Sequence, residues 1–260
     1  MEKRSDGFLI NKKEHEKDFI FGSRVVLEAL HSDQEIDKIL LNKEQNSEMT
    51  KEVLQLAKSK GVPISRVPEG KLNRITRKNH QGVIAYISAI SYASLDNVVD
   101  ACFSKGIAPL LLMLDRITDV RNFGAIARSA EVAGVHALLI PEKGSAQINS
   151  DAVKTSAGAL NYLPVCRVKN LYYALKDLKK MGLNVVSVTE KTDRPLYQAD
   201  FSVPTVLVLG SEEDGISNEL LGISDEFVQI PVAGQIESLN VSVAAAVAIY
   251  EAVRQRKGKR

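Results

Sequence analysis

Residues 209–243 read LGSEEDGISNELLGISDEFVQIPVAGQIESLNVSV, and this stretch decides the fold. An apolar strand pattern runs into an acidic loop that lies between Gly210 and Gly215. A second apolar segment, residues 227–230, leads to the polar turn at residues 238–240, where a long helical pattern begins. In α/β proteins, ligand pockets form at the carboxyl ends of the strands. Two such strand ends therefore predict one shared pocket.

The sequence around this stretch repeats the same alternation of strands and helices. Continuous apolar runs separated by helical patterns indicate a parallel sheet that is covered on both faces. The predicted strands are residues 110–114, 137–140, 164–168, 185–189, 206–209 and 227–230, and the predicted helices between them include 122–135, 150–159 and 170–181. A final helix, residues 241–256, places Val243, Val247, Tyr250 and Val253 on one stripe. That stripe is either core or a subunit interface.

The rest of the chain predicts a second, smaller α/β unit. We expect residues 1–17 to be a disordered tail, residues 18–88 a small substrate domain, residues 89–106 a linker and residues 107–260 the main domain. The tail lacks the apolar core of a signal peptide. The boundary between the linker and the main domain rests only on a change in composition.

Composition excludes several classes of protein. The chain has 260 residues, a net charge of +2 and two widely spaced cysteines, so we expect neither a disulfide framework nor a zinc site. No apolar run is long enough to span a membrane. The four histidines show no metal-binding spacing, and there is no Gly-x-Gly-x-x-Gly, Walker or Gly-x-Ser-x-Gly motif. We therefore expect a cytoplasmic protein with no metal.

The loop after the first predicted strand of the main domain carries polar groups that could bind a ligand. Asp115 and Asp119 precede Asn122, the predicted N-cap of the next helix, and Arg128 lies among small residues. Small neighbours leave the guanidinium of Arg128 room to receive a planar or anionic group. The alternative is an ion pair between Arg128 and Asp115 or Asp119.

Two further loops carry candidate groups. Glu212 lies in the acidic loop, whose charge would repel a nucleoside triphosphate; the alternative is a solvated turn that caps a helix. Ser238, Asn240 and Ser242 surround the start of the last helix, which needs fewer groups for capping alone.

Basic residues gather in two places. The first set is Lys71, Arg74, Arg77, Lys78 and His80, and the second is Arg254, Arg256, Lys257, Lys259 and Arg260. Either set is a solvated surface or a contact for nucleic acid.

Three segments of the main domain resemble the signature motifs of the SpoU/TrmH family of RNA ribose 2′-O-methyltransferases. They are DVRNFGAIARSA (residues 119–130), LVLGSEEDG (207–215) and IPVAGQIESLNVSVAAAV (230–247). The family usually has proline where this chain has Val120, and proline would stiffen the loop. FGSRVVLEAL (21–30) together with HQGVIA (80–85) resembles the small RNA-binding domain of the member that methylates a guanosine of 23S rRNA, a domain similar to certain large-subunit ribosomal proteins.

The resemblance implies a SPOUT-type parallel-sheet domain with a C-terminal trefoil knot, a homodimer and S-adenosylmethionine as cofactor. It implies backbone or side-chain contacts with the cofactor from Thr189, Leu209, Gly210, Ile230, Ser238 and Leu239. The catalytic positions that it matches are Asn122, Arg128, Glu212, Ser238 and Asn240. We interpret Arg128 as a stabiliser of the developing alkoxide or of the adjacent phosphate, because a guanidinium is a poor proton acceptor.

The function that follows is transfer of a methyl group to the ribose 2′-hydroxyl of a guanosine in 23S rRNA. Lys71, Arg74, Arg77, Lys78 and His80 would then contact the RNA. Three alternatives stay open: the same chemistry on tRNA, a non-catalytic RNA-binding or ribosome-assembly protein, and a nucleotide-dependent enzyme on an ordinary doubly wound sheet.

Overall fold

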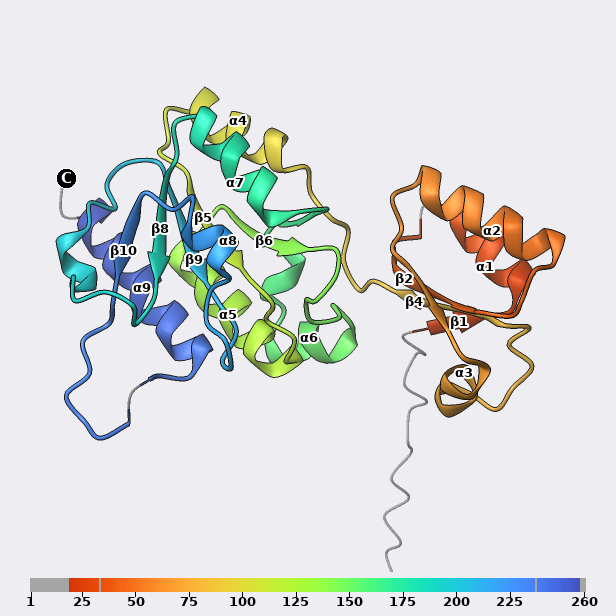
Figure 1. The fold of residues 1–260 in the computed structure, drawn as a ribbon. Helices are drawn as coiled ribbons and strands as arrows, with labels where there is room; N and C mark the ends of the chain where they lie inside the picture. Colours follow the sequence, from red (N-terminus) through yellow and green to blue (C-terminus); the bar gives the residue numbers. More distant parts are fainter. Residues whose placement is uncertain (1–18, 33, 237, 258–260) are drawn as a thin grey trace, which may run out of the picture. The chain divides into compact units, whose positions relative to one another are not determined.

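The computed structural model describes residues 19–32, 34–236 and 238–257, which form two compact units that divide after Ile87 (Figure 1). The expected disordered tail, residues 1–17, lies outside the described residues, as do Lys259 and Arg260 of the second basic set. No helix in the described ranges is long and apolar enough to cross a membrane.

The first unit is a four-stranded sheet with helices. Strands β1 (Phe19–Phe21), β4 (Val83–Ile87), β2 (Ile36–Asn42) and β3 (Ile64–Val67) lie side by side in that order. β2 and β3 are parallel, whereas β4 runs antiparallel to β1 and β2. The helices are α1 (Ser23–His31), α2 (Glu48–Ser59) and α3 (Glu69–Ile75). Leu72 of α3 packs in a core cluster with Leu40, Val67 and Ile84, and this contact anchors the basic segment to the sheet.

The second unit is a six-stranded parallel sheet, as the apolar runs predicted. The strands are β5 (Leu110–Leu114), β6 (Ala137–Pro141), β7 (Val165–Val168), β8 (Asn184–Val188), β9 (Thr205–Leu209) and β10 (Glu226–Val228), in the spatial order β10-β8-β9-β5-β6-β7. The helices are α4 (Leu95–Ser104), α5 (Val120–Ala133), α6 (Ser150–Thr155), α7 (Leu171–Lys180), α8 (Asn218–Leu221) and α9 (Val241–Lys257).

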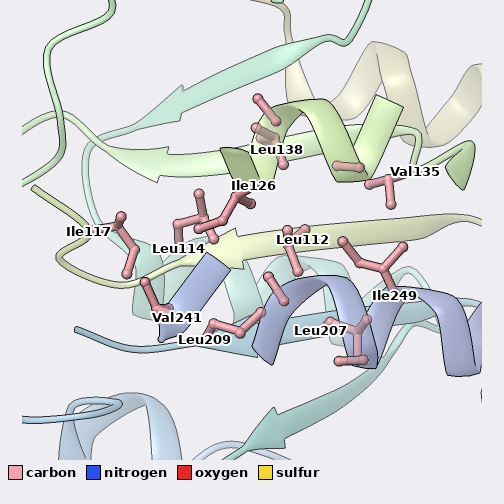
Figure 2. Close-up of a cluster of buried hydrophobic side chains, with 14 of the residues drawn as sticks. Leu112, Leu114, Ile117, Ile126, Val135, Leu138, Leu207, Leu209, Val241 and Ile249 are labelled. Carbon is pink, nitrogen blue, oxygen red and sulfur yellow. The ribbon is translucent and has the colours of Figure 1, made fainter. Parts of the chain in front are cut away.

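Helices cover both faces of this sheet (Figure 1). Side chains of α5, α6 and α9 pack on one face, and side chains of α4, α7 and α8 pack on the other. Strands buried on both faces can be apolar throughout, and all five residues of β5 and of β9 are buried. Figure 2 shows Ile126 of α5 and Ile249 of α9 directed at Leu112, Leu114, Leu207 and Leu209 of these strands.

The register of the sheet aligns the carboxyl ends of four neighbouring strands. Leu114 at the end of β5 pairs with Leu209 at the end of β9. Ser187 of β8 pairs with Val208 of β9, and Val188 at the end of β8 pairs with Val228 at the end of β10. The loops that follow these strands therefore start from one edge, which is where ligands bind in α/β sheets.

One expectation changes with the structure. The expected linker, residues 89–106, contains α4, whose Val99 and Cys102 are buried in the second unit. Composition did not reveal this helix because its amphipathic face is short. Ser94, whose side chain accepts the Asn97 amide at the N-cap, is a local signal of the helix start. The knot implied by the resemblance stays a prediction.

Most of the predicted apolar stripe of α9 is exposed within this chain, although its fourth member, Val253, is partly buried against the core. Val243, Val247 and Tyr250 are 47%, 40% and 51% exposed, and the helix buries Ala245, Ala248, Ile249 and Ala252 instead. Three alanines bring α9 close to the sheet, and Ile249 is buried beside them, whereas Val243, Val247 and Tyr250 lie on the outer side of the helix. These three side chains are therefore surface within the single chain, and a subunit interface stays a prediction.

Arg256, in the second basic set, joins the last helix to the sheet. Its guanidinium donates to the carbonyls of Ala108, Pro109, Phe201 and Val203 at 2.6–2.9 Å. Burial lowers the pKa of Arg256 from its usual value, although the group stays charged. This member of the set is structural rather than a free contact for nucleic acid.

Arg256→Ala should lower the free energy of unfolding by about 2–3 kcal/mol, because hydrogen bonds to a charged donor are worth more than neutral ones. Urea denaturation measures the change. Arg254→Ala is the matched control: Arg254 is exposed and pairs with Glu251, and such surface pairs contribute little. Equal losses in the two variants would contradict the structural role of Arg256.

Candidate active site

Three loops meet at the carboxyl edge of the sheet. The first follows β5 and starts α5, where the side chain of Asp119 accepts the Asn122 amide at 2.8 Å. The prediction that Asn122 caps this helix is therefore wrong, because α5 begins at Val120 and Asp119 takes the capping position. This shift frees the side chain of Asn122 for other partners.

A triangle of hydrogen bonds joins the three loops. The Nδ2 atom of Asn122 donates to Glu212 Oε1 at 2.8 Å. The Nδ2 atom of Asn240 donates to the same oxygen at 2.7 Å and to Asn122 Oδ1 at 3.1 Å. Each corner comes from a different segment: the start of α5, the acidic loop after β9, and the turn before α9. The predicted convergence of Asn122, Glu212 and Asn240 is confirmed.

The start of α9 fixes the orientation of the Asn240 amide. Its Oδ1 accepts the backbone amide of Ser242 at 2.9 Å and the Ser242 hydroxyl at 2.5 Å. With the oxygen occupied, the NH₂ group must face Glu212. Asn240 therefore caps α9 and also holds the Glu212 carboxylate. Helix capping and a role in the site, the two functions considered for this turn, are thus compatible.

The triangle leaves one acceptor and one donor available. Within the described residues, Glu212 Oε2 and the second N–H of Asn122 have no hydrogen-bond partner. A hydroxyl needs one acceptor and one donor of this kind. A cavity of about 260 Å³ opens here, lined by Arg116, Ile117, Thr118, Asp119, Asn122, Ser211, Glu212, Glu213, Asp214 and Val241.

Arg116 connects the first loop to the acidic loop. Its Nη1 donates to Asp214 Oδ2 and its Nη2 to the Gly215 carbonyl, both at 2.9 Å. It also pairs with Asp115, whose side chain is buried and accepts the Ser217 amide at 2.7 Å. The hydrogen bond with Asp115 is the main reason that the pKa of Arg116 is raised.

Gly210 allows the acidic loop to close on itself. A Cβ at this position would lie 2.0 Å from the carbonyl carbon of Gly215, so no other residue fits. Ser211 and Gly215 exchange backbone hydrogen bonds at 3.0 and 3.1 Å across the turn. Close packing thus requires glycine at position 210, whereas a positive φ of 66° favours glycine at position 215. The turn directs Glu212 outward.

The structure brings most of the predicted cofactor-binding residues to this edge. Leu209 ends β9 and Gly210 follows it, Thr189 follows β8, and Ile230 lies two residues beyond β10. A second, largely apolar cavity of about 450 Å³ lies beside Ile230 and is lined by Leu196, Tyr197, Ile230, Pro231, Val247, Tyr250 and Glu251.

Arg128 does not join the triangle. Its side chain is exposed and has no ion pair within the described residues. The alternative pairing with Asp115 or Asp119 is wrong, because Asp115 binds Arg116 and Asp119 caps α5. Arg128 lies six positions after Asn122 in α5, so the two side chains point to different sides of the helix. Ser238 and Leu239 are also exposed and lie in the loop before α9.

The basic set of the first unit divides in two. Lys71, Arg74, Arg77 and Lys78 are exposed on α3 and the loop after it. His80, in contrast, is only 6% exposed; its Nδ1 accepts the Gly82 amide at 3.0 Å and its Nε2 bonds Asn73 at 2.9 Å. The prediction that His80 contacts RNA directly is wrong, because its ring holds the loop together.

Arg116 is a residue of the site that the sequence patterns do not predict. Its backbone has φ +61°, a left-handed conformation that favours glycine. An arginine beside an aspartate at the end of a strand gives no signal of either the turn or the two-loop contact. Among the described residues, no three or more His, Cys, Asp or Glu side chains lie close enough together to hold a metal ion.

Comparison with known proteins places this geometry in a family. Residues 109–250 match the model of the SpoU rRNA methylase family, and residues 19–93 match that of the RNA 2′-O ribose methyltransferase substrate-binding domain. The chain is 37% identical over 228 residues to the 23S rRNA (guanosine-2′-O-)-methyltransferase RlmB of Ralstonia nicotianae, covering 87% of this chain and 90% of that protein. It is 38% identical over 250 residues to an uncharacterized tRNA/rRNA methyltransferase of Mycolicibacterium vanbaalenii, covering 95% and 79%.

Solved structures agree with the sequence relatives. The SpoU methyltransferase AviRb from Streptomyces viridochromogenes, crystallised with its cofactor AdoMet, superposes with a TM-score of 0.59 at 26% identity over 92% of this chain and 90% of that one. Each of the two units of this chain therefore matches a family model. Each corner of the hydrogen-bonded triangle lies in one of the three segments that resemble the signature motifs of the family. The chain belongs to the SpoU rRNA methylase family of RNA 2′-O-ribose methyltransferases.

Proposed function

We propose that this protein transfers a methyl group from S-adenosylmethionine to the 2′-hydroxyl of a guanosine in 23S rRNA. The observation that carries the proposal is the Asn122–Glu212–Asn240 triangle, because it presents a free acceptor beside a free donor at the cavity. The choice of 23S rRNA and of guanosine rests on the likeness to RlmB and on the substrate-binding domain.

The residues at the carboxyl edge fit the cofactor. Of the predicted cofactor contacts, Ile230 lines the apolar cavity, whose volume is in the usual range for small-molecule sites. Glu212, Glu213 and Asp214 would attract the positively charged sulfur and repel a nucleoside triphosphate, which disfavours the nucleotide-dependent alternative. Leu209, Gly210, Ile230 and Leu239 would hold the cofactor through backbone groups, with Thr189 and Ser238 beside them. When bound, S-adenosylmethionine supplies an electrophilic methyl group that leaves behind a neutral thioether.

The protein's own part is to position the ribose. Glu212 Oε2 would accept the hydrogen of the 2′-hydroxyl, and the free N–H of Asn122 would donate to its oxygen. Holding two reactants in line in this way can lower a barrier by about 7–11 kcal/mol. Asn240 keeps Glu212 in place, and Ser238 would complete the ribose contacts from the loop before α9.

Arg128 would act on the RNA backbone. Because its side chain is exposed and lies apart from the triangle, we assign it to the phosphate next to the target ribose rather than to the alkoxide. A guanidinium binds phosphate oxygens bidentately, so Arg128 would fix the register of the RNA strand at the cavity.

A tRNA substrate is the second candidate. A structure concerned with 2-OH methylation of C/U34 on tRNA shares the fold, with a TM-score of 0.53 at 27% identity over 58% of this chain. That match covers fewer residues than the second unit contains, whereas the substrate-binding model matches residues 19–93 of this chain. The first unit is thus what favours rRNA.

Mapping of ribose methylation in 23S rRNA and in tRNA, from cells with and without this protein, tests the proposal. One guanosine of 23S rRNA should lose its methyl group when the protein is absent. Loss at a tRNA ribose would support the second candidate. No change in either RNA would favour the non-catalytic alternative, against which the intact triangle argues.

Arg128→Ala should reduce turnover to background while S-adenosylmethionine still binds, because the residue lies away from the predicted cofactor contacts. Transfer of labelled methyl to RNA measures turnover, and calorimetry measures cofactor affinity. Loss of cofactor affinity would contradict the assigned role.

Reversal of charge at Arg74 and Arg77 should weaken RNA binding and flatten its dependence on salt. Each lost phosphate contact should reduce the slope of log K against log salt by about 0.7–0.9. Arg24→Glu is a matched control, since Arg24 is exposed on α1 and pairs with Glu28. An unchanged slope for the Arg74 and Arg77 variant would reject the RNA-binding assignment.

A homodimer through the second unit would cover the exposed apolar stripe of α9. Val247→Asp should convert such a dimer to monomers, because a buried, unpaired carboxylate is costly. Analytical ultracentrifugation gives the mass. Val25→Asp, at another exposed valine on α1, should leave the mass unchanged. A wild-type monomer, or a dimer that tolerates Val247→Asp, would rule out this interface.

A further inference from the structure

We propose that Arg116 is a positioning residue that acts through Glu212 by clamping the acidic loop to the loop after β5. The inference rests on the proposed function, since it assigns Arg116 a part in methyl transfer. Neither the matched motifs nor the sequence analysis pointed to this residue.

The clamp spans two segments that are about a hundred residues apart in the chain. On one side, Asp115 is 4% exposed and is held by the Ser217 amide, so it forms a rigid anchor. On the other side, Nη1 reaches Asp214 and Nη2 reaches the Gly215 carbonyl. The guanidinium thus fills the gap between a buried carboxylate and the turn that carries Glu212.

The clamp determines where Glu212 points. Asp214 lies two residues after Glu212, and its amide is bound by Ser211 Oγ at 3.1 Å, so the turn from Ser211 to Gly215 moves as one piece. The ends of the turn are held by the tight contact at Gly210 and by the bond from the Ser217 amide to Asp115. Without Arg116, the tip between these two ends would lose its contacts through Asp214 and Gly215, and Glu212 Oε1 would separate from Asn122 and Asn240.

The backbone of Arg116 indicates that the side chain is needed. At φ +61°, a non-glycine residue is disfavoured, and glycine would be relaxed. A purely local turn would therefore be served better by glycine. Lysine cannot replace arginine either, because one ammonium group lacks the planar fork that reaches Asp115, Asp214 and Gly215 together.

Arg116→Gly separates the two possible roles. If Arg116 only shapes the turn, this variant should fold at least as stably and keep full activity. If it positions Glu212, kcat for labelled methyl transfer to RNA should fall about 100-fold, the loss that follows displacement of a catalytic group by about 1 Å. The affinity for S-adenosylmethionine, measured by calorimetry, should stay the same. Ala157→Gly is the matched control, since Ala157 also has a positive φ of 51° and lies outside the site.

A double-mutant cycle with Glu212→Gln shows whether the effect runs through Glu212. Residues that act as a unit give non-additive losses, so adding Arg116→Gly to Glu212→Gln should reduce kcat by less than about threefold. Additive losses, or full activity of Arg116→Gly, would overturn the proposal.

Two controls keep the outcome clear. If Arg116→Gly fails to fold, the same cycle is run with Arg116→Lys, which keeps the charge and should also lose kcat; full activity of Arg116→Lys would overturn the proposal. An absence of methyl transfer by the wild-type protein to both 23S rRNA and tRNA would instead refute the proposed function itself. The two failures are therefore distinguishable.

Discussion

The in-register pairing of β5 with β9 is the constraint on which the site depends. Leu114 and Leu209 end these strands side by side, and each strand is buried along its whole length between two layers of helices. A slip of one residue would exchange the side chains facing the two helical layers, so packing holds the register firmly. The loops after β5 and β9 therefore start at the same level, and Asn122 and Glu212 meet.

Around that pairing, short-range contacts refine the geometry. Asp119 begins α5 one turn earlier than expected and frees Asn122, Gly210 lets the acidic turn close, and Ser242 orients the Asn240 amide. The core fixes the position of each loop, whereas hydrogen bonds fix the direction of each functional atom. In the first unit, buried Leu72 and His80 likewise hold α3 and the loop after it in place, while the basic side chains of this segment stay exposed.

Much of this arrangement follows from local sequence patterns, and the remainder depends on contacts between distant segments. Apolar runs such as 110–114 predict the parallel strands, because burial on both faces removes the alternation of polar residues. The convergence of Asn122, Glu212 and Asn240 also follows, since loops after parallel strands share an edge. In contrast, the burial of His80, the packing of α4 and the clamp by Arg116 have no local signal. Each depends on a partner elsewhere in the chain or on a backbone angle that residue type alone would disfavour. The exposed side chain of Arg128 shows the same limit, because a matched motif position does not say which way a side chain points.

The central claim is that the three loops form one pocket in which a ribose hydroxyl faces an activated methyl group. A crystal structure of the protein with S-adenosylmethionine tests it most directly. The account predicts that the cofactor lies at the carboxyl ends of β8, β9 and β10, with its methyl group open to the space beside Glu212 Oε2. A cofactor bound elsewhere, or a structure in which Asn122, Glu212 and Asn240 lie apart, would contradict it.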